Sequence, residues 1–358
     1  MEGYARIARL ASLGQRSELV AALGQLGACP SEIAATLRGH HLSGLVRTSL
    51  DEGSPTVCPK LLAALDAVRP VQTATADELL ALFDDVRQRL DQVRVPVLLL
   101  KGRYFADRLY GGAAPRPQFD VDVLVPSRRH REAGRALVAA GFERVAYDLH
   151  SQTFARRGLK VDLHRYLRWA PAYGISEAAI WTTAQPTRVG TIEARTLSDE
   201  YTLVLLALGA FEDLGQGMTK LKQLVDLYLM LREVDGMLDW EAFFEKRARE
   251  NIDGIAATVF ALVAALFDVE SEMPRLAAAL AARGHACDEA GRRLALELTF
   301  ATRKAPASLA WFRRVYPGSL PLYLWWFWLG GFPANLHGPG ASRLNETLRV
   351  AFGRRQSV

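Results

Sequence analysis

The spacing of hydrophobic residues divides the chain into a helical segment, a strand-rich segment and a second helical segment. Through residues 1–94, apolar side chains recur at helical intervals, as in Leu19, Leu23 and Leu26, which predicts amphipathic helices. The run Thr75-Ala-Asp-Glu78 matches a capping box, so we expect a helix to begin there and to continue to about Val93. Residues 1–94 therefore form a predicted N-terminal helical region.

The pattern changes to that of β-strands at Val95. The run from Val95 to Leu100 is almost continuously apolar, as in a buried strand. The run from Phe119 to Val125 first alternates apolar and acidic residues and then becomes apolar. Further strands are expected at 142–148, 150–156 and 159–164, and a short β segment reaches Leu197. The strand-rich core is thus predicted over residues 95–197.

Helical periodicity returns after Leu197, where Ser198-Asp-Glu is a helix-opening pattern. Helices are expected at 199–213, 218–232, 239–251, 254–267, 274–284, 288–303 and 342–352. This order of elements predicts an α+β protein, with a C-terminal helical domain over residues 198–358 after the strand-rich core.

The composition agrees with a folded protein that has no membrane span. Half of the 358 residues are hydrophobic and 23% are charged, which allows a large packed core and excludes global disorder. No window contains about 18 uninterrupted apolar residues, and no secretory signal is visible. Three cysteines, Cys29, Cys58 and Cys287, are too far apart for a zinc or disulfide framework. A cytoplasmic location is expected.

The positive charge is concentrated near the C-terminal end of the sequence. The net charge is +5, and residues 310–358 contain six arginines against one acidic residue, Glu346. The same stretch holds four of the seven tryptophans, three of them between Tyr323 and Trp328. Two interpretations stay open for the basic tail: a solvated end, or a docking surface for an acidic partner. For the aromatic segment the alternatives are a core helix and a binding surface.

Three aspartates predict a metal centre. Asp120 and Asp122 lie two positions apart on a predicted strand, so their carboxylates point to the same side. Two adjacent carboxylates repel each other unless a cation lies between them. Mg²⁺ is the natural candidate because it prefers oxygen ligands and keeps room for phosphates; Mn²⁺ is the alternative. Asp162, on a later strand, can complete a two-metal site and activate an incoming hydroxyl.

The residues before this acidic strand suit a phosphate group. A buried strand is followed by Lys101-Gly102 and then by the start of a helix. Gly102 allows close approach of the backbone, the first amides of the helix point towards an anion, and Lys101 adds a positive charge. Arg116, four residues before Asp120, pairs either with the same phosphates or with the aspartates. Lys101, Gly102 and Arg116 are therefore candidate nucleotide-binding residues.

Two histidines flank a predicted hairpin. If its strands pair around Arg157-Gly158, His150 and His164 are opposite each other, on the side of the sheet that carries Asp162. They are either hydrogen-bonded residues of a half-buried sheet, or His164 orients the acceptor or a phosphate. The other histidines, among them His40 and His41, have no ligand partners at useful spacing and are expected to be structural.

These motifs resemble those of a nucleotidyltransferase family within the DNA polymerase β-like superfamily. The matching elements are Lys101-Gly102, Leu109-Tyr110, Arg116, the run from Asp120 to Val125, Gly141-Phe142 and the run from Val161 to His164. The resemblance covers roughly residues 1–235. One departure is that Lys101-Gly102-Arg103 stands where most of the superfamily has Gly-Ser.

The resemblance implies a small mixed β-sheet flanked by helices, and three acidic residues that bind Mg²⁺ and a nucleoside triphosphate. It also implies that Lys222 reaches the triphosphate; the alternative is a surface ion pair with Asp226. The expected reaction transfers a nucleotidyl group to a hydroxyl or phosphate of a small molecule, peptide or RNA, with release of pyrophosphate. Two alternatives stay open: glycosyl transfer from a nucleotide-sugar to a peptide or phosphopeptide, and a non-catalytic nucleotide-binding module.

Overall fold

The computed structural model describes residues 2–50, 57–147, 150–168, 173–215, 219–267 and 271–285, together with Arg293, Leu296, Thr299 and Phe300. The basic tail and its aromatic segment lie outside the described residues, as do the expected helix at 342–352 and most of the one at 288–303. Within the described part of the chain, no helix combines the length and the apolar character needed to cross a membrane.

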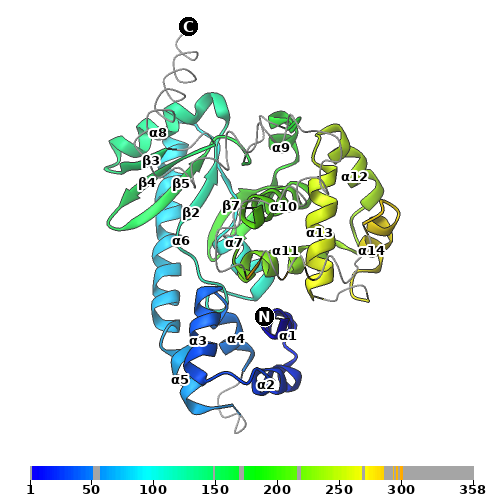
Figure 1. The fold of residues 1–358 in the computed structure, drawn as a ribbon. Helices are drawn as coiled ribbons and strands as arrows, with labels where there is room; N and C mark the ends of the chain where they lie inside the picture. Colours follow the sequence, from blue (N-terminus) through cyan, green and yellow to red (C-terminus); the bar gives the residue numbers. More distant parts are fainter. Residues whose placement is uncertain are drawn as a thin grey trace, which may run out of the picture.

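In the described part of the chain, seven strands form one mixed sheet in the order β3-β4-β5-β2-β1-β7-β6 (Figure 1). Strand pairs β2–β5 and β1–β7 are parallel, and the other neighbours are antiparallel. The strands are β1 (Leu98–Leu99), β2 (Val121–Leu124), β3 (Glu143–Tyr147), β4 (Ser151–Arg156), β5 (Leu159–His164), β6 (Gln185–Val189) and β7 (Ile192–Thr196). The protein is therefore α+β, as the sequence predicts.

The two faces of the sheet pack against different helices. Alternate side chains of a strand point to opposite faces, so Val121 and Val123 lie on one face of β2 and Leu124 on the other. The valines join a hydrophobic cluster with α6 (Arg69–Gln92) and α8 (His130–Ala139). Leu124 joins a larger cluster with the C-terminal helices. The side chain of Asp122 on β2 consequently points towards the C-terminal helices.

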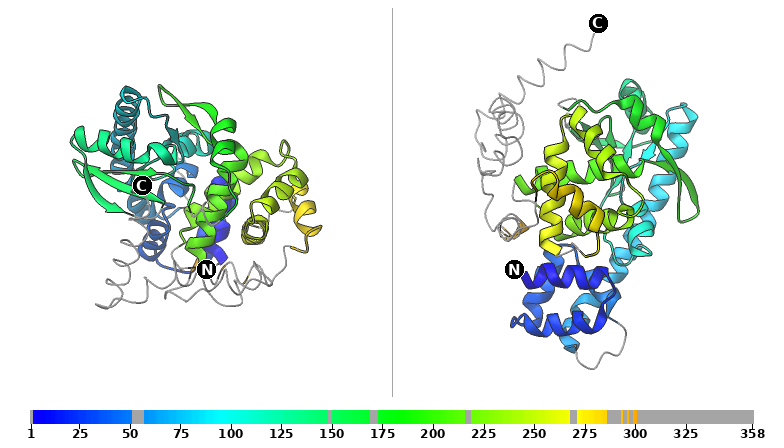
Figure 2. Two further views of the ribbon diagram at one scale, coloured as in Figure 1. Left: turned by 90° about the horizontal axis from the view of Figure 1, so that it is seen from above. Right: turned by 90° about the vertical axis from the view of Figure 1, so that its right-hand side faces the viewer.

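The N-terminal and C-terminal helices share that larger cluster. Helix α1 packs against α11 and α13, and the N-terminal helices gather at one end of the molecule (Figure 2). The N-terminal helices are α1 (Glu2–Ser12), α2 (Arg16–Gln25), α3 (Pro30–Gly39), α4 (Ser43–Ser49) and α5 (Pro59–Asp66). The C-terminal helices are α10 (Asp199–Gly215), α11 (Leu221–Val234), α12 (Trp240–Arg249), α13 (Asp253–Phe267) and α14 (Pro274–Ala281).

Three short helices connect the strands. Helix α7 (Arg103–Tyr110) follows β1, the 3₁₀ helix η1 (Ser127–Arg129) leads from β2 into α8, and α9 (Glu177–Thr183) precedes β6. Helix α9 is capped by Ser176, whose hydroxyl accepts a hydrogen bond from the backbone N–H of Ala179 at 3.2 Å. A side-chain cap of this kind satisfies an amide that the helix itself leaves free.

Two local predictions were wrong. Helix α6 begins at Arg69 rather than at Thr75, because Pro70 provides an earlier start in its first turn and the helix continues through the capping-box pattern. The β4–β5 hairpin has the predicted two-residue turn, since Arg156 pairs with Leu159 around Arg157 and Gly158, both with positive φ, but the expected pairing of two histidines across it is wrong.

With this turn, the expected pairing of His150 with His164 is wrong by one residue, because Ser151 and His164 are equally far from the turn. His164 lies opposite Ser151, not opposite His150, and Thr153 lies opposite Asp162. The backbone oxygen of His150 instead accepts a hydrogen bond from the N–H of Arg165 at 2.9 Å. The two imidazole rings are nevertheless close, with centroids 5.5 Å apart.

Candidate active site

The parallel pairing of β2 with β5 brings the acidic residues together. Asp122 is in register with Asp162, and Leu124 with His164. Because the strand period is two, Asp120, Asp122, Asp162 and His164 share one face of the sheet. The sequence therefore predicted which acids converge, and the strand register supplies the imidazole beside them.

Asp122, Asp162 and His164 form a compact group in which one potential ligand atom from each residue lies within 4.8 Å of the others. The Oδ1 atom of Asp122 is 3.0 Å from Nε2 of His164 and 3.2 Å from Nζ of Lys101. Asp162 accepts a hydrogen bond of 2.6 Å from the hydroxyl of Thr153. The three side chains thus converge on a single point at the sheet surface.

The buried carboxylates have opposite pKa shifts. Burial alone would raise the pKa of Asp122, but the charge of Lys101 and the hydrogen bond with His164 outweigh it and hold that pKa below its usual range. Burial and the negative charge of Asp122 raise the pKa of Asp120 to about 6, although Lys101 opposes this shift. Burial also lowers the pKa of His164, which favours the neutral imidazole that a metal ion requires.

These residues fit a divalent cation. Among the described residues, no hydrogen-bond partner reaches the buried Oδ2 atom of Asp122, and a buried carboxylate oxygen without a partner is costly. Burial and the nearby negative charge of Asp122 raise the pKa of Asp120, and a bound cation would offset both. Carboxylate oxygens suit Mg²⁺ or Mn²⁺, and the imidazole nitrogen is a further ligand for Mn²⁺. The group can therefore hold a metal ion.

The predicted phosphate-binding segment begins beside these acids. The backbone N–H of Leu100 donates to the oxygen of Asp122 at 3.0 Å, which aligns the end of β1 with the middle of β2. Gly102 follows with φ 69° and ψ −121° and leads into α7. This conformation is accessible to glycine and strained for other residues. The helix N-terminus and Lys101 therefore flank the acidic group.

Arg116 forms an ion pair with the buried carboxylate of Asp226. Its Nε and Nη2 atoms donate to the two oxygens of Asp226, each at 2.8 Å, and its Nη1 donates to the oxygen of Gly102 at 3.1 Å. The hydroxyl of Tyr110 also donates to Asp226 at 2.7 Å. The guanidinium group thus connects the segment before α7 with α11. Asp226 is 3% exposed, so the alternative of a surface pair between Lys222 and Asp226 was wrong.

Lys222 lies in the first turn of α11, close to the acidic group. Burial, together with the positive charge of Arg116, lowers its pKa to about 8, and the charges of Asp226 and Asp120 oppose that shift. Its backbone N–H donates to the oxygen of His40 at 3.3 Å. Lys222 and Lys101 therefore place two amines near Asp120.

The sequence did not predict that the corner between α3 and α4, formed by His40 and His41, lies near the candidate site. His40 and His41 were expected to be structural, yet they lie beside the start of α11, and the ring of His41 packs against Phe119 at 4.8 Å. Burial and the neighbouring Lys220 lower the pKa of His40 to about 4. Burial and Lys222 do the same for His41. No local motif signals this contact, because the partners are far apart in the sequence.

A family model described as an uncharacterised nucleotidyltransferase matches residues 28–268 of the chain. Among solved structures, the chain is similar to an antigenic nucleotidyltransferase-like protein from Paracoccidioides brasiliensis, with 16% sequence identity and a TM-score of 0.33. That similarity covers 61% of this chain and 93% of the other. No curated protein matches the chain. The segment 28–268 includes strands β1 to β7 and the residues of the candidate site.

Proposed function

Because this chain belongs to the uncharacterised nucleotidyltransferase family, we propose that it is a Mg²⁺-dependent nucleotidyltransferase that uses a nucleoside triphosphate. The acceptor is a small molecule, a peptide or an RNA. An acceptor hydroxyl or phosphate oxygen forms a bond to the α-phosphorus, and the bond from that phosphorus to the oxygen bridging to the β-phosphate breaks. Pyrophosphate leaves with the bonding electrons, and a hydroxyl proton passes to the carboxylate of Asp162.

The grouping of Asp122, Asp162 and His164 is the observation that carries this proposal. With Asp120 beside them, these residues would hold one or two divalent ions. Mg²⁺ bound there would neutralise the triphosphate and stabilise the charge that develops on the transferred group. The unpartnered Oδ2 atom of Asp122 supports the same assignment.

The basic groups on the Asp120 side supply the binding of the phosphates. The N-terminus of α7 offers backbone amides after Gly102, and Lys101 and Lys222 offer ammonium groups. Arg116 acts through Asp226: it is a positioning residue that fixes the start of α11, and with it Lys222. In this role Arg116 supports nucleotide binding without touching the phosphates.

Nucleotide binding by Asp122→Asn tests this proposal. Each of ATP, GTP, CTP, UTP and UDP-glucose is titrated into the protein by calorimetry, with and without Mg²⁺. We expect one or more triphosphates to bind only with Mg²⁺, and both Asp122→Asn and the double variant Asp120→Asn/Asp122→Asn to abolish that binding while the circular dichroism spectrum is unchanged.

The matched control is Asp84→Asn, which removes a carboxylate from the partly exposed pair with Arg87 on α6. This variant should bind nucleotide as the unaltered protein does. Triphosphate affinity that is the same in the Asp122 variants and in the control would refute the metal-dependent site. Preference for UDP-glucose would instead support the glycosyl-transfer alternative.

A further inference from the structure

A pocket of about 250 Å³ adjoins the acidic group beyond the ends of β2 and β5. Leu124, which lines it, lies two positions after Asp122 and therefore on the same face of the strand. With a rise of about 3.3 Å per residue, Leu124 is about 7 Å from Asp122 along β2. Arg165 and Tyr166, which follow His164 directly, line the pocket as well. The pocket is thus next to the carboxylates but is built from other residues.

The pocket and the phosphate-binding segment lie at opposite ends of the acidic group. Strand β1 is antiparallel to β2, with Leu99 opposite Val123, so Lys101 and the start of α7 are at the Asp120 end of β2. The pocket is at the Leu124 end. In an in-line phosphoryl transfer, the attacking oxygen and the leaving pyrophosphate are on opposite sides of the phosphorus. If pyrophosphate leaves at the Lys101 end, the acceptor enters from the pocket.

The walls of the pocket are largely apolar and aromatic. Its principal side chains are Leu124, Leu167, Ile180, Tyr166, Tyr173 and Trp181. Two residues of the pocket are charged. The carboxylate of Glu177 accepts hydrogen bonds from the backbone N–H and the hydroxyl of Ser127, at 2.8 and 2.5 Å. The guanidinium of Arg165 lies over the ring of Tyr166, with its carbon 5.2 Å from the ring centre. Such walls favour a flat ring over a sugar or a phosphate.

We propose that this pocket binds the acceptor of the transfer proposed above, on which the inference rests, and that the acceptor carries its reacting hydroxyl on a flat, largely apolar ring, as in a phenol. The volume is below the range of pockets that hold drug-sized ligands, so the bound part is one small ring system. A free phenolic compound and the tyrosine side chain of a peptide share this chemistry. The hydroxyl points from the pocket towards Asp162.

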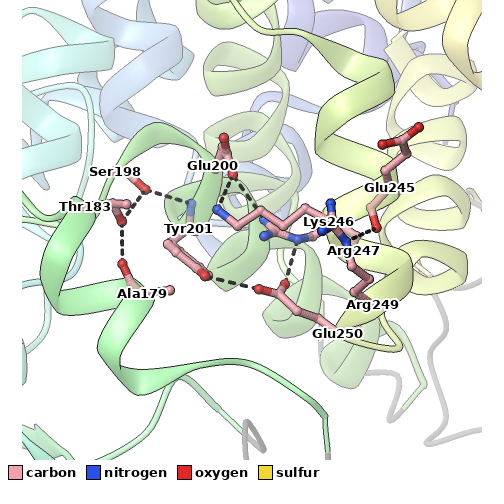
Figure 3. A network of polar contacts seen from close by, with 10 residues as sticks. All are labelled: Ala179, Thr183, Ser198, Glu200, Tyr201, Glu245, Lys246, Arg247, Arg249 and Glu250. Atoms are coloured by element: carbon pink, nitrogen blue, oxygen red, sulfur yellow. Dashed lines mark hydrogen bonds and ion pairs between the residues drawn. The ribbon is translucent and has the colours of Figure 1, made fainter.

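A polar network fixes the helix that forms one side of the pocket (Figure 3). The hydroxyl of Thr183 on α9 donates to the backbone oxygen of Ala179 at 2.8 Å and lies 3.4 Å from the hydroxyl of Ser198. On α10, the hydroxyl of Tyr201 donates to Glu250 at 3.1 Å. Arg247 pairs with Glu250 at 2.7 Å. The backbone N–H of Gly174, a pocket residue, donates to the oxygen of Glu250 at 3.0 Å. The pocket therefore has a wall held in place by α10 and α12, as a specific binding site requires.

Binding of tyramine tests the pocket without any chemistry. Saturation-transfer NMR should show that tyramine binds the full-length protein and that glucose does not. Tyr166→Ala and Tyr173→Ala each remove an aromatic wall, so we expect about ten-fold weaker tyramine binding. The control Tyr147→Ala alters an exposed tyrosine of β3, on the edge of the sheet, and should bind as the unaltered protein does.

Tyramine that fails to bind, or that binds the Tyr166, Tyr173 and Tyr147 variants equally, overturns the inference. Circular dichroism establishes whether each variant is folded. If either Tyr166→Ala or Tyr173→Ala does not fold, the tyramine affinity of the remaining pocket variant tests the inference. Calorimetry with the Mg²⁺ triphosphate is run on the same samples. Its affinity should be unchanged in all three variants, because the triphosphate lies at the other end of the site.

Transfer assays identify the source of the ring. The protein is incubated with Mg²⁺ and α-labelled triphosphate, together with tyramine, phenethylamine, Gly-Gly-Tyr-Gly-Gly, Gly-Gly-Ser-Gly-Gly or glucose. Label on tyramine alone indicates a small-molecule acceptor, and label on the tyrosine peptide indicates a peptide; Tyr166→Ala should raise the KM for either about ten-fold. Label on glucose or on the serine peptide refutes the inference and leaves the nucleotidyltransferase intact. If no triphosphate binds, the proposed function fails, and the tyramine NMR experiment still decides the pocket.

Discussion

Asp122 has two oxygens in different environments. Its Oδ1 atom contacts Lys101 and His164, at 3.2 and 3.0 Å, whereas Oδ2 is buried with no hydrogen-bond partner in the part of the chain that the structure describes. The contacts at Oδ1 keep the carboxylate ionised and oriented. The other oxygen is left to a ligand, which explains how a fully buried carboxylate can remain negative and still be available to a cation.

Lys101 should contribute more to the binding of triphosphate than to that of monophosphate, because its charge is proposed to meet the distal phosphates. Lys101→Ala is expected to weaken triphosphate binding about ten-fold or more, the typical value of a hydrogen bond to a charged group, and to change monophosphate binding less. Calorimetry with ATP and AMP measures both, or the corresponding pair for the preferred base. Lys60→Ala, on the exposed surface of α5, is the control. An equal loss for both nucleotides would make Lys101 a structural residue.

Among the candidate site residues, the sequence predicts the proximity of those that are separated by short spacing. Asp120 and Asp122 are two apart on one strand, and Lys101-Gly102 follows a strand directly, so local periodicity is sufficient to group them. The pairing of Arg116 with Asp226 joins residues 110 positions apart, and the approach of His41 to Lys222 depends on how α3 and α4 pack. Contacts of this kind arise from tertiary packing, which no local pattern encodes.

At the scale of elements, α11 is held to the segment before α7 by a buried ion pair. Arg116 is 2% exposed and Asp226 3%, and each needs the other because an isolated buried charge is strongly unfavourable. Since α11 also carries Lys222, this pair determines where an amine of the site lies. The ion pair is therefore both a packing contact and a positioning device.

Removal of one partner of that pair should destabilise the protein. Asp226→Asn leaves the charge of Arg116 buried without its counter-ion, so we expect the free energy of unfolding to fall by about 3–5 kcal/mol. Urea unfolding followed by circular dichroism measures the change. The double variant Arg116→Met/Asp226→Leu, which removes both charges, should lose less stability. A loss below about 1 kcal/mol in Asp226→Asn would contradict the assigned role of the pair.

Strands and helices could be predicted from the sequence where a single local pattern, such as hydrophobic alternation, determines them. The alternation of Phe119 to Val125 predicted β2, and the apolar run around Leu98 predicted β1, although hydrogen bonding limits that strand to Leu98–Leu99. The hairpin turn at Arg157-Gly158 was predicted too, but the pairing of His150 with His164 was wrong by one residue, because a two-residue turn places Ser151 opposite His164. Helix starts are similarly set by single residues such as Pro70.

At the scale of the whole molecule, the corner between α3 and α4 links stability to pH. The pKa values of His40 and His41 are lowered to about 4, by burial first and then by Lys220 and Lys222, against 6.5 in the unfolded chain. Between pH 6.5 and 4 the unfolded state therefore binds more protons. Stability from these histidines is complete above pH 6.5 and decreases as the pH falls through this range.

Urea unfolding at pH 7.5 and pH 5 should show this loss, and His40→Gln/His41→Asn should reduce it. Asparagine is chosen at position 41 because His41 has φ 60°, which asparagine tolerates. The raised pKa of Asp120 makes stability change with pH in the opposite direction. The pH dependence of the free energy of unfolding is therefore compared between the unaltered protein and the double histidine variant. The same pH dependence in both would exclude the histidines as its source.

Because β1 lies inside the sheet, one of its edges has no partner while the rest of the chain is being synthesised. This two-residue strand is paired on one side with β2 and on the other with β7, where Leu99 meets Thr196. At a synthesis rate of about 5–20 residues per second, several seconds or more separate the two strands on the ribosome. During that interval one edge of β1 has no partner, and open strand edges promote association with other chains. The yield of folded protein is therefore expected to depend on chaperones and on the speed of translation until residue 196 has emerged.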